Sequence, residues 1–246
     1  MKTDSKFAIS SSRVAMVIVI RAFLLGAVFV LSSGRFNLAI ANPVADLPFA
    51  GSFPQQEDGW TAIKTDEGIL FVWNRKDLSF TLSIKGNEIR PMDAGENIFF
   101  VVDGLVLQIQ SLPISNFAPD ARTKKLDEKS ILMAHRDWEV RFLENELLHS
   151  KLTVQSSSEK LANGREALIW QYDLPEGFRT ADATKQMYLS VVAKDYIVLL
   201  NGVVNATASE STVRSFLLAK IATLKISPDR IDVKRLQEAI RKGADH

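Results

Sequence analysis

Hydrophobic and polar residues alternate in several short stretches of the chain, a period typical of β-strands with one buried face. Turn-forming residues separate these stretches, and the Asp103-Gly104 pair between two of them is a strong signal for a tight hairpin turn. Because the connections are short, successive strands are expected to run antiparallel. The predicted strand pairs are residues 68–73 with 78–84, 97–102 with 105–110, 151–156 with 166–173, and 186–192 with 196–204.

Longer stretches carry the 3.6-residue period of amphipathic helices. The longest, residues 126–148, has apolar side chains on two sides, which predicts a helix packed on two sides. A second helix is expected to begin at Thr207, because Thr207 and Glu210 have the spacing of a capping box. Ser227-Pro228 is expected to cap a final helix over residues 229–241.

The order of these elements indicates an α+β protein. Helices with an apolar face need a sheet to cover, so the predicted fold is an α/β/α sandwich with a central antiparallel β-sheet covered by helices. Residues 42–58 hold several prolines and no sustained period, which is typical of a flexible linker. The predicted organisation is therefore an export or membrane segment over residues 1–41, this linker, an α+β domain over residues 59–226, and a C-terminal amphipathic helix and tail over residues 227–246.

The N-terminal segment combines an apolar stretch, residues 14–31, with small residues further on. Arg21 interrupts the stretch, and an arginine at the centre of a membrane span costs about 2.5 to 3.5 kcal/mol on insertion scales. Residues 22–31 suit the apolar region of an export signal better than a span, and Ala39-Ile40-Ala41 supplies the small residues that a signal peptidase reads. We therefore expect a periplasmic or secreted protein, with a signal peptide cleaved after Ala41 or, as the alternative, an uncleaved N-terminal anchor as its contact with the membrane.

The amino-acid composition excludes several kinds of functional site. The chain has no cysteine, which excludes disulfides, thiol nucleophiles, thiolate metal sites and a lipid-modified cysteine. The net charge is +1, but after residue 41 the chain holds 25 basic and 28 acidic residues. This part of the chain lacks the excess of basic residues that is typical of a nucleic-acid-binding protein, so we expect no nucleic-acid partner.

Residues that could carry catalysis or bind a metal are sparse. His135 and His149 lie too far apart along the predicted helix to chelate one metal, since such ligands need a spacing of three or four. No serine lies in a Gly-x-Ser-x-Gly elbow. The kinase-like His135-Arg136-Asp137 has Phe142 where a kinase loop requires asparagine. We therefore predict no catalytic residue, no cofactor and no metal site.

Aromatic residues on the long helix give the first candidate for a binding surface. His135, Trp138 and Phe142 fall on one face at helical spacing, and this face is expected to meet the sheet. A cluster of rings at a helix–sheet junction could bind a protein partner or a small ligand.

The chain from residue 126 to residue 226 resembles the PsbP/Mog1/DcrB-like superfamily. The stretches that carry the resemblance are LANGREA at 161–167, KQMYLSVVAKDYIVLLNGVV at 185–204 and STVRSFLLAKIATLKIS at 211–227. The resemblance implies an α/β/α sandwich and an accessory or binding role, and it carries over no catalytic residue.

These observations favour a non-catalytic extracytoplasmic protein. We expect it to bind a still unidentified protein partner or to help an envelope complex assemble. The alternative is an exported protein that binds a small apolar molecule or a lipid between the long helix and the sheet. A metal-independent hydrolase with paired carboxylates is the least favoured class.

Overall fold

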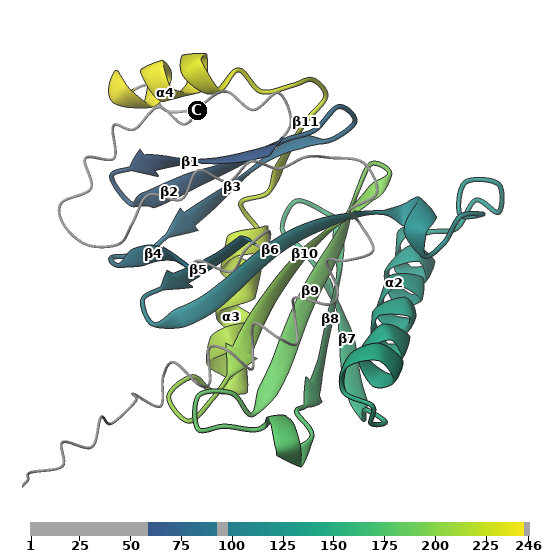
Figure 1. Cartoon of the computed structure of the whole chain (residues 1–246). Helices are drawn as coiled ribbons and strands as arrows, with labels where there is room; N and C mark the ends of the chain where they lie inside the picture. Colours follow the sequence, from purple (N-terminus) through teal and green to yellow (C-terminus); the bar gives the residue numbers. More distant parts are fainter. Residues whose placement is uncertain (1–58, 93–97, 244–246) are drawn as a thin grey trace, which may run out of the picture.

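The computed structural model describes residues 59–92 and 98–243, which form two antiparallel β-sheets and a few helices (Figure 1). The predicted α+β class is confirmed. The larger sheet has seven strands in the order β4-β5-β6-β10-β9-β8-β7, and the smaller has four in the order β1-β2-β3-β11. The strands are β1 (Gly59–Thr65), β2 (Gly68–Asn74), β3 (Ser79–Lys85), β4 (Ile89–Met92), β5 (Ile98–Val102), β6 (Leu105–Pro113), β7 (Val154–Lys160), β8 (Glu166–Asp173), β9 (Lys185–Ala193), β10 (Tyr196–Val204) and β11 (Lys225–Ser227).

Tight turns set the register of the hairpins. β5 and β6 join through Asp103 and Gly104, whose φ angles of 49° and 84° are those a type I′ turn requires. β9 and β10 join at Lys194, which also has a positive φ of 57°. The four predicted strand pairs are present, although β7 begins only at Val154.

One long helix covers part of one face of the seven-stranded sheet. α2 (Glu128–Phe142) contacts β8 and β9, and Figure 1 shows it beside this end of the sheet. Asp127 caps it by accepting a hydrogen bond from the Ser130 backbone N–H at 2.7 Å. The π-helical turn η3 (Leu143–Leu147) extends it, and both apolar sides of the predicted helix pack into one core. Both apolar sides are therefore packed, as predicted, and they belong to the same core.

The opposite face of the large sheet is covered by α3 (Glu210–Ile221) and by the four-stranded sheet. Phe71 of β2 and Leu217 of α3 share one core with Leu200 of β10. At Gly202 the missing side chain lets α3 approach closely, since a Cβ there would lie 2.8 Å from Val213 Cγ1. The sequence predicted a single sheet between helices, whereas a second sheet provides much of this layer.

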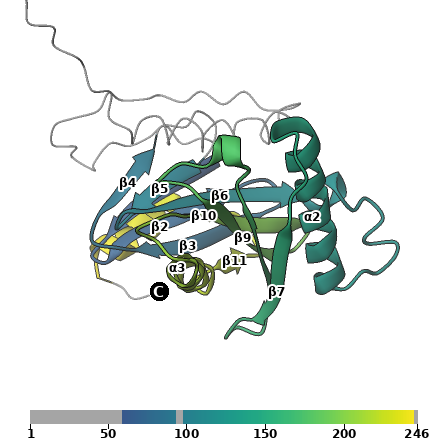
Figure 2. The ribbon, with the colours of Figure 1, turned by 90° about the horizontal axis from the view of Figure 1, so that it is seen from below.

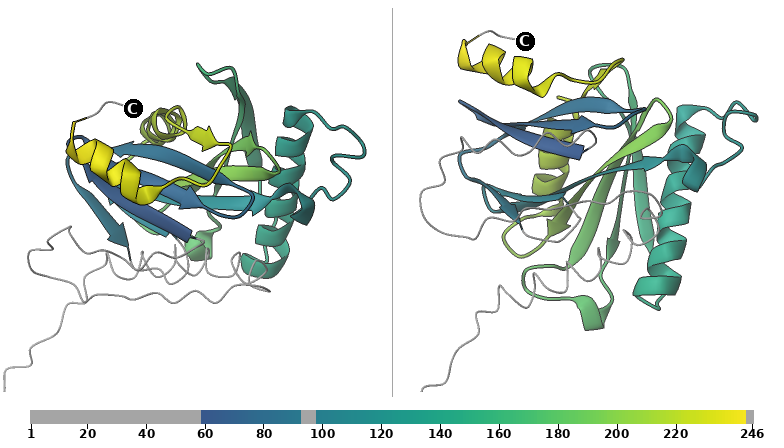
Figure 3. Two further views of the ribbon diagram at one scale, coloured as in Figure 1. Left: turned by 90° about the horizontal axis from the view of Figure 1, so that it is seen from above. Right: turned by 45° about the horizontal axis from the view of Figure 1, so that its top comes forward.

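The C-terminal helix lies on the outside of the four-stranded sheet. α4 (Val233–Arg241) lies over it in both views of Figure 3 and contacts β1. The side chain of Asn74 holds the chain that leads into α4, exchanging two hydrogen bonds of 2.9 and 3.0 Å with the backbone of Ile231. Asp232 is the N-cap, so the helix begins later than the predicted residue 229.

Several local predictions differ from the structure. Ser209, not Thr207, caps α3, because the Asn205 side chain accepts the Thr207 backbone N–H and holds that residue in a turn before the helix. β1, β4 and β11 were not predicted. Their patterns are weak, because β4 contains Pro91 and β11 has three residues. Two short 3-10 turns, η2 (Ile114–Asn116) and η4 (Glu176–Phe178), complete the fold.

The predicted export segment and linker lie outside the described residues, so export after cleavage at Ala41 stays a prediction. Within residues 59–92 and 98–243, no helix has the length and apolar character needed to cross a membrane.

Candidate functional site

The three residues predicted to form a binding surface lie close together on α2. Trp138 and Phe142 are half-buried and stacked, with ring centroids 6.5 Å apart. Phe117, from the segment before α2, contacts Trp138 and His135 at centroid distances of 6.4 and 5.2 Å. His135 is fully buried and faces β9, where its Nδ1 lies 3.5 Å from Ser190 Oγ. The predicted residues therefore meet, but in a packed helix–sheet junction in which His135 has no exposed surface.

Ser190 and His135 have the residue types of a nucleophile and its base. Burial lowers the pKa of His135 to about 4, which leaves the ring a weak base at neutral pH. Its Nε2 has no hydrogen-bond partner in the part of the chain that the structure describes, so no third group orients the ring. Since both side chains are also fully buried, this pair is a core contact.

Beside this junction, polar and aromatic side chains form a row across the seven-stranded sheet. Gln108 of β6 lies opposite Asn201 of β10, and Asn201 lies opposite Tyr188 of β9. Tyr188 lies opposite Trp170 of β8, and the two rings stack at 4.0 Å. Residues directly opposite one another point to the same face of a sheet, and both rings belong to the core beneath α2. The row therefore lies on the α2 side of the sheet.

A third amide extends this row along β9. Gln186 lies two residues before Tyr188, and positions two apart on a strand share a face. We call Gln108, Gln186 and Asn201 the amide cluster. Their exposed fractions are 1, 1 and 0%.

Most of the polar atoms in the amide cluster lack a protein partner. Asn201 Nδ2 donates to the Met187 carbonyl at 3.2 Å. The other five atoms, which are Asn201 Oδ1 and both amide atoms of Gln108 and Gln186, have no hydrogen-bond partner among the described residues. Buried polar atoms are normally paired with protein, ordered water or a ligand, and an unpaired one costs about 1–3 kcal/mol. The amide cluster therefore holds five buried hydrogen-bonding atoms whose partners are not among the described residues.

One carboxyl group lies close to this face. Glu139, half-buried on α2, has its pKa raised to about 7 by burial. Burial is also the main cause of the raised pKa values of Tyr172 and Tyr188, and the negative charge of Glu139 adds to both. The amides, phenols and indole of this face can donate and accept hydrogen bonds without a fixed charge.

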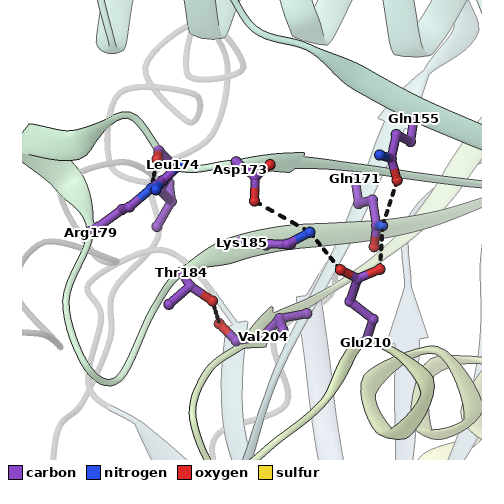
Figure 4. A network of polar contacts seen from close by, with 9 residues as sticks. All are labelled: Gln155, Gln171, Asp173, Leu174, Arg179, Thr184, Lys185, Val204 and Glu210. Carbon is purple, nitrogen blue, oxygen red and sulfur yellow. Dashed lines mark hydrogen bonds and ion pairs between the residues drawn. The ribbon is translucent and has the colours of Figure 1, made fainter.

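A separate polar network lies on the opposite face, where α3 begins (Figure 4). Lys185 of β9 lies 3.3 Å from Asp173 Oδ1 and 2.5 Å from Glu210 Oε1. Glu210 also accepts a hydrogen bond from Gln171 Nε2 at 2.7 Å. Because Glu210 is the first residue of α3, its negative charge also interacts favourably with the positive end of the helix dipole. This network ties α3 to the sheet and is structural.

Lys185→Met is expected to lower the free energy of unfolding at pH 7 by about 0.5–1 kcal/mol, because the ion pairs are partly exposed. The Lys185 hydrogen bond is the main cause of the lowered pKa of Glu210. A lowered folded-state pKa means that the stabilisation is present above the ordinary value of 4.5 and is lost as the pH falls. Urea unfolding at pH 7 and about pH 3 should therefore show a smaller loss in acid. Lys160→Met, at an exposed position of β7, is the control, and an equal loss at both pH values would contradict the assignment.

An open groove of about 730 Å³ lies near the start of α2 and the β9–β10 turn. Two cationic side chains of the groove, Lys194 and Arg165, already donate hydrogen bonds to backbone carbonyls. Lys194 Nζ donates to the carbonyls of Ser227 and Pro228, and Arg165 donates to the carbonyl of Val192. We therefore assign this groove no binding role.

The amide cluster was not predicted from the sequence. The signal was an amide inside an otherwise apolar strand, as in LVLQIQ around Gln108 and YIVLLNGVV around Asn201. Without the register, nothing shows that Gln108 and Asn201 lie opposite each other.

No protein-family model matches the chain, and no curated protein matches it either. Among the described residues, no group of three or more histidine, aspartate or glutamate side chains could hold a metal ion.

Proposed function

We propose that this protein is a non-catalytic binding module that holds a small, uncharged polar molecule against the α2 side of its seven-stranded sheet. The amide cluster carries the proposal, because five of its six amide atoms are buried and without a partner in the described chain. A ligand that supplies the missing hydrogen bonds would offset a cost of about 1–3 kcal/mol for each unpaired group.

The chemistry of the face defines the class of ligand. Each amide offers a donor and an acceptor, which fits hydroxyl or amide groups on the ligand. An anion is disfavoured, because Glu139 lies near this face and neither the amide cluster nor its aromatic neighbours Tyr188 and Trp170 carry a positive charge. A small apolar ligand, which was the alternative to a protein partner in the sequence-based expectation, would leave the amides unpaired.

The wider role that we propose follows from the sequence. The N-terminal segment supports export to the periplasm or the outside, and the resemblance to the PsbP/Mog1/DcrB-like superfamily, with its α/β/α sandwich, supports an accessory role beside a protein partner in the envelope. A bound polar molecule would then be what the module senses or carries for that partner.

The full chain should be purified from its own cells, and its bound molecules identified by native mass spectrometry. We expect one uncharged polar ligand per chain, which raises the midpoint of thermal unfolding when it is added back. Gln108→Met is expected to weaken binding about tenfold, since one hydrogen bond contributes about 1 kcal/mol or more. Gln110→Met, on the same strand and face but half-buried, is the matched control.

In the ligand-free protein, Gln108→Met should raise the free energy of unfolding by about 1–2 kcal/mol, because it removes two unpaired polar atoms and keeps the volume. Chemical unfolding measures this gain. Recovery of the chain without a ligand, or equal loss of binding in Gln108→Met and Gln110→Met, would overturn the proposed function.

A further inference from the structure

One of the two edge strands of the seven-stranded sheet lacks the features that discourage pairing with another strand. β7 is its last strand, opposite β4, and Figure 2 shows it at the rim of the molecule. β4 has four residues and includes Pro91, both of which discourage pairing with another strand. β7 has seven residues without proline, and no described strand pairs with its outer edge. Residues 155–158 are exposed.

Arginines from the two helices hold β7 from both faces. Arg136 of α2 donates to Ser156 Oγ at 3.0 Å. On the other face, Arg214 of α3 donates to Ser157 Oγ at 3.2 Å and pairs with Glu159. Because these contacts and the pairing with β8 fix the strand, its edge presents backbone donors and acceptors that are already ordered.

We propose that β7 pairs antiparallel with β7 of a second copy of this chain, about a two-fold axis at Ser157. This centre is the one that pairs all seven residues, since Val154 then lies opposite Lys160 of the other copy. Gln155 lies opposite Glu159, so the amide can donate to the carboxylate and no like charges meet. The strand that we propose to pair with this edge is therefore β7 of the second copy.

The helices leave room for this pairing. α2 lies over β8 and β9, so the two α2 helices would be separated by at least three strand spacings, or about 14 Å. Packed helices need about 8–10 Å between their axes. This contact is independent of the amide cluster and would stand if the ligand proposal failed.

Cysteine cross-linking tests the pairing, since the chain has no cysteine of its own. Ser157→Cys in the full chain, oxidised in intact cells with copper phenanthroline, should give disulfide-linked dimers. Opposite residues in an antiparallel pair have Cα atoms about 4.5–5.5 Å apart, within the range of a disulfide. We expect cross-linking at least ten times faster than for Ser211→Cys, an exposed position on α3.

Ser158→Cys tests the register. Its counterpart in the second copy would lie diagonally, about 7–8 Å away, which is too far for a disulfide. Slow cross-linking through Ser158→Cys beside fast cross-linking through Ser157→Cys supports the proposed axis. Three results would each overturn the proposal. In the first, Ser157→Cys cross-links no faster than Ser211→Cys. In the others, Ser158→Cys cross-links faster than Ser157→Cys, or a different protein is captured instead of a second copy.

Discussion

Replacing Gly68 by alanine is expected to lower the free energy of unfolding by about 3 kcal/mol or more. Gly68 begins β2 with a φ of +147°, a conformation that residues with a side chain rarely adopt. A Cβ there would lie 2.2 Å from the backbone oxygen of Ile84, on the neighbouring strand β3. Because the obstacle is the backbone of a paired strand, it cannot move aside without disturbing the β2–β3 ladder. Urea unfolding measures the loss.

Gly104→Ala is the matched control. Gly104 also has a positive φ, of +84°, but nothing lies within 4 Å of a Cβ built there. Its substitution should therefore cost only the backbone strain, about 1 kcal/mol. The difference between the two variants isolates the crowding at Gly68, and equal losses would show that the crowding has no effect.

The predicted hairpins are present because strand and turn signals agree locally. The Asp103-Gly104 turn and the flanking alternation point to the same structure, and β8 and β10 have the predicted bounds. The second sheet was missed for the opposite reason. Alternation shows that β2 and β3 have a buried face, but it does not show whether helices or another sheet cover that face.

Only part of the candidate site could be predicted. The sequence shows which residues share a face of a helix, but it does not show which residues of two separate strands lie opposite each other. His135, Trp138 and Phe142 are close in sequence on one helix, so their proximity follows from the 3.6-residue period. The burial of His135 depends on β9, and the contact between Gln108 and Asn201 joins strands far apart in the chain. Such contacts depend on tertiary register, which the pattern of one strand does not contain.

The two faces of the seven-stranded sheet differ in the kind of polar groups that they hold. On the α3 side, Lys185 and Glu210 pair with each other and with neighbouring side chains. On the α2 side, amides are buried without such partners among the described residues. The α3 side therefore holds ion pairs that stabilise the fold, although Gln171 Oε1 is unpaired there among the described residues, and the α2 side holds the larger group of unpaired amide atoms, which lower stability.

Glu139→Gln is expected to raise the free energy of unfolding by about 2 kcal/mol at pH 8 and by less than about 1 kcal/mol at pH 5. Burial raises the pKa of Glu139 to about 7, from an ordinary value of 4.5. The folded chain therefore binds this proton more tightly than the unfolded chain, so stability falls as the pH rises from 4.5 through 7. The full shift corresponds to about 3 kcal/mol, which we reduce because the side chain is only half-buried.

Glutamine resembles the protonated carboxyl group, so the variant should lose this pH dependence while it keeps the packing against the sheet. Unfolding of the ligand-free chain at several pH values measures the difference between wild type and variant, in which the titration of other groups largely cancels. Glu146→Gln, at an exposed position in η3, is the matched control. If the Glu139→Gln difference were the same at pH 5 and pH 8, the carboxyl group would be ionised in the folded chain at both pH values. The α2 side would then disfavour an anion through a permanent charge at Glu139, not through one that appears near neutral pH.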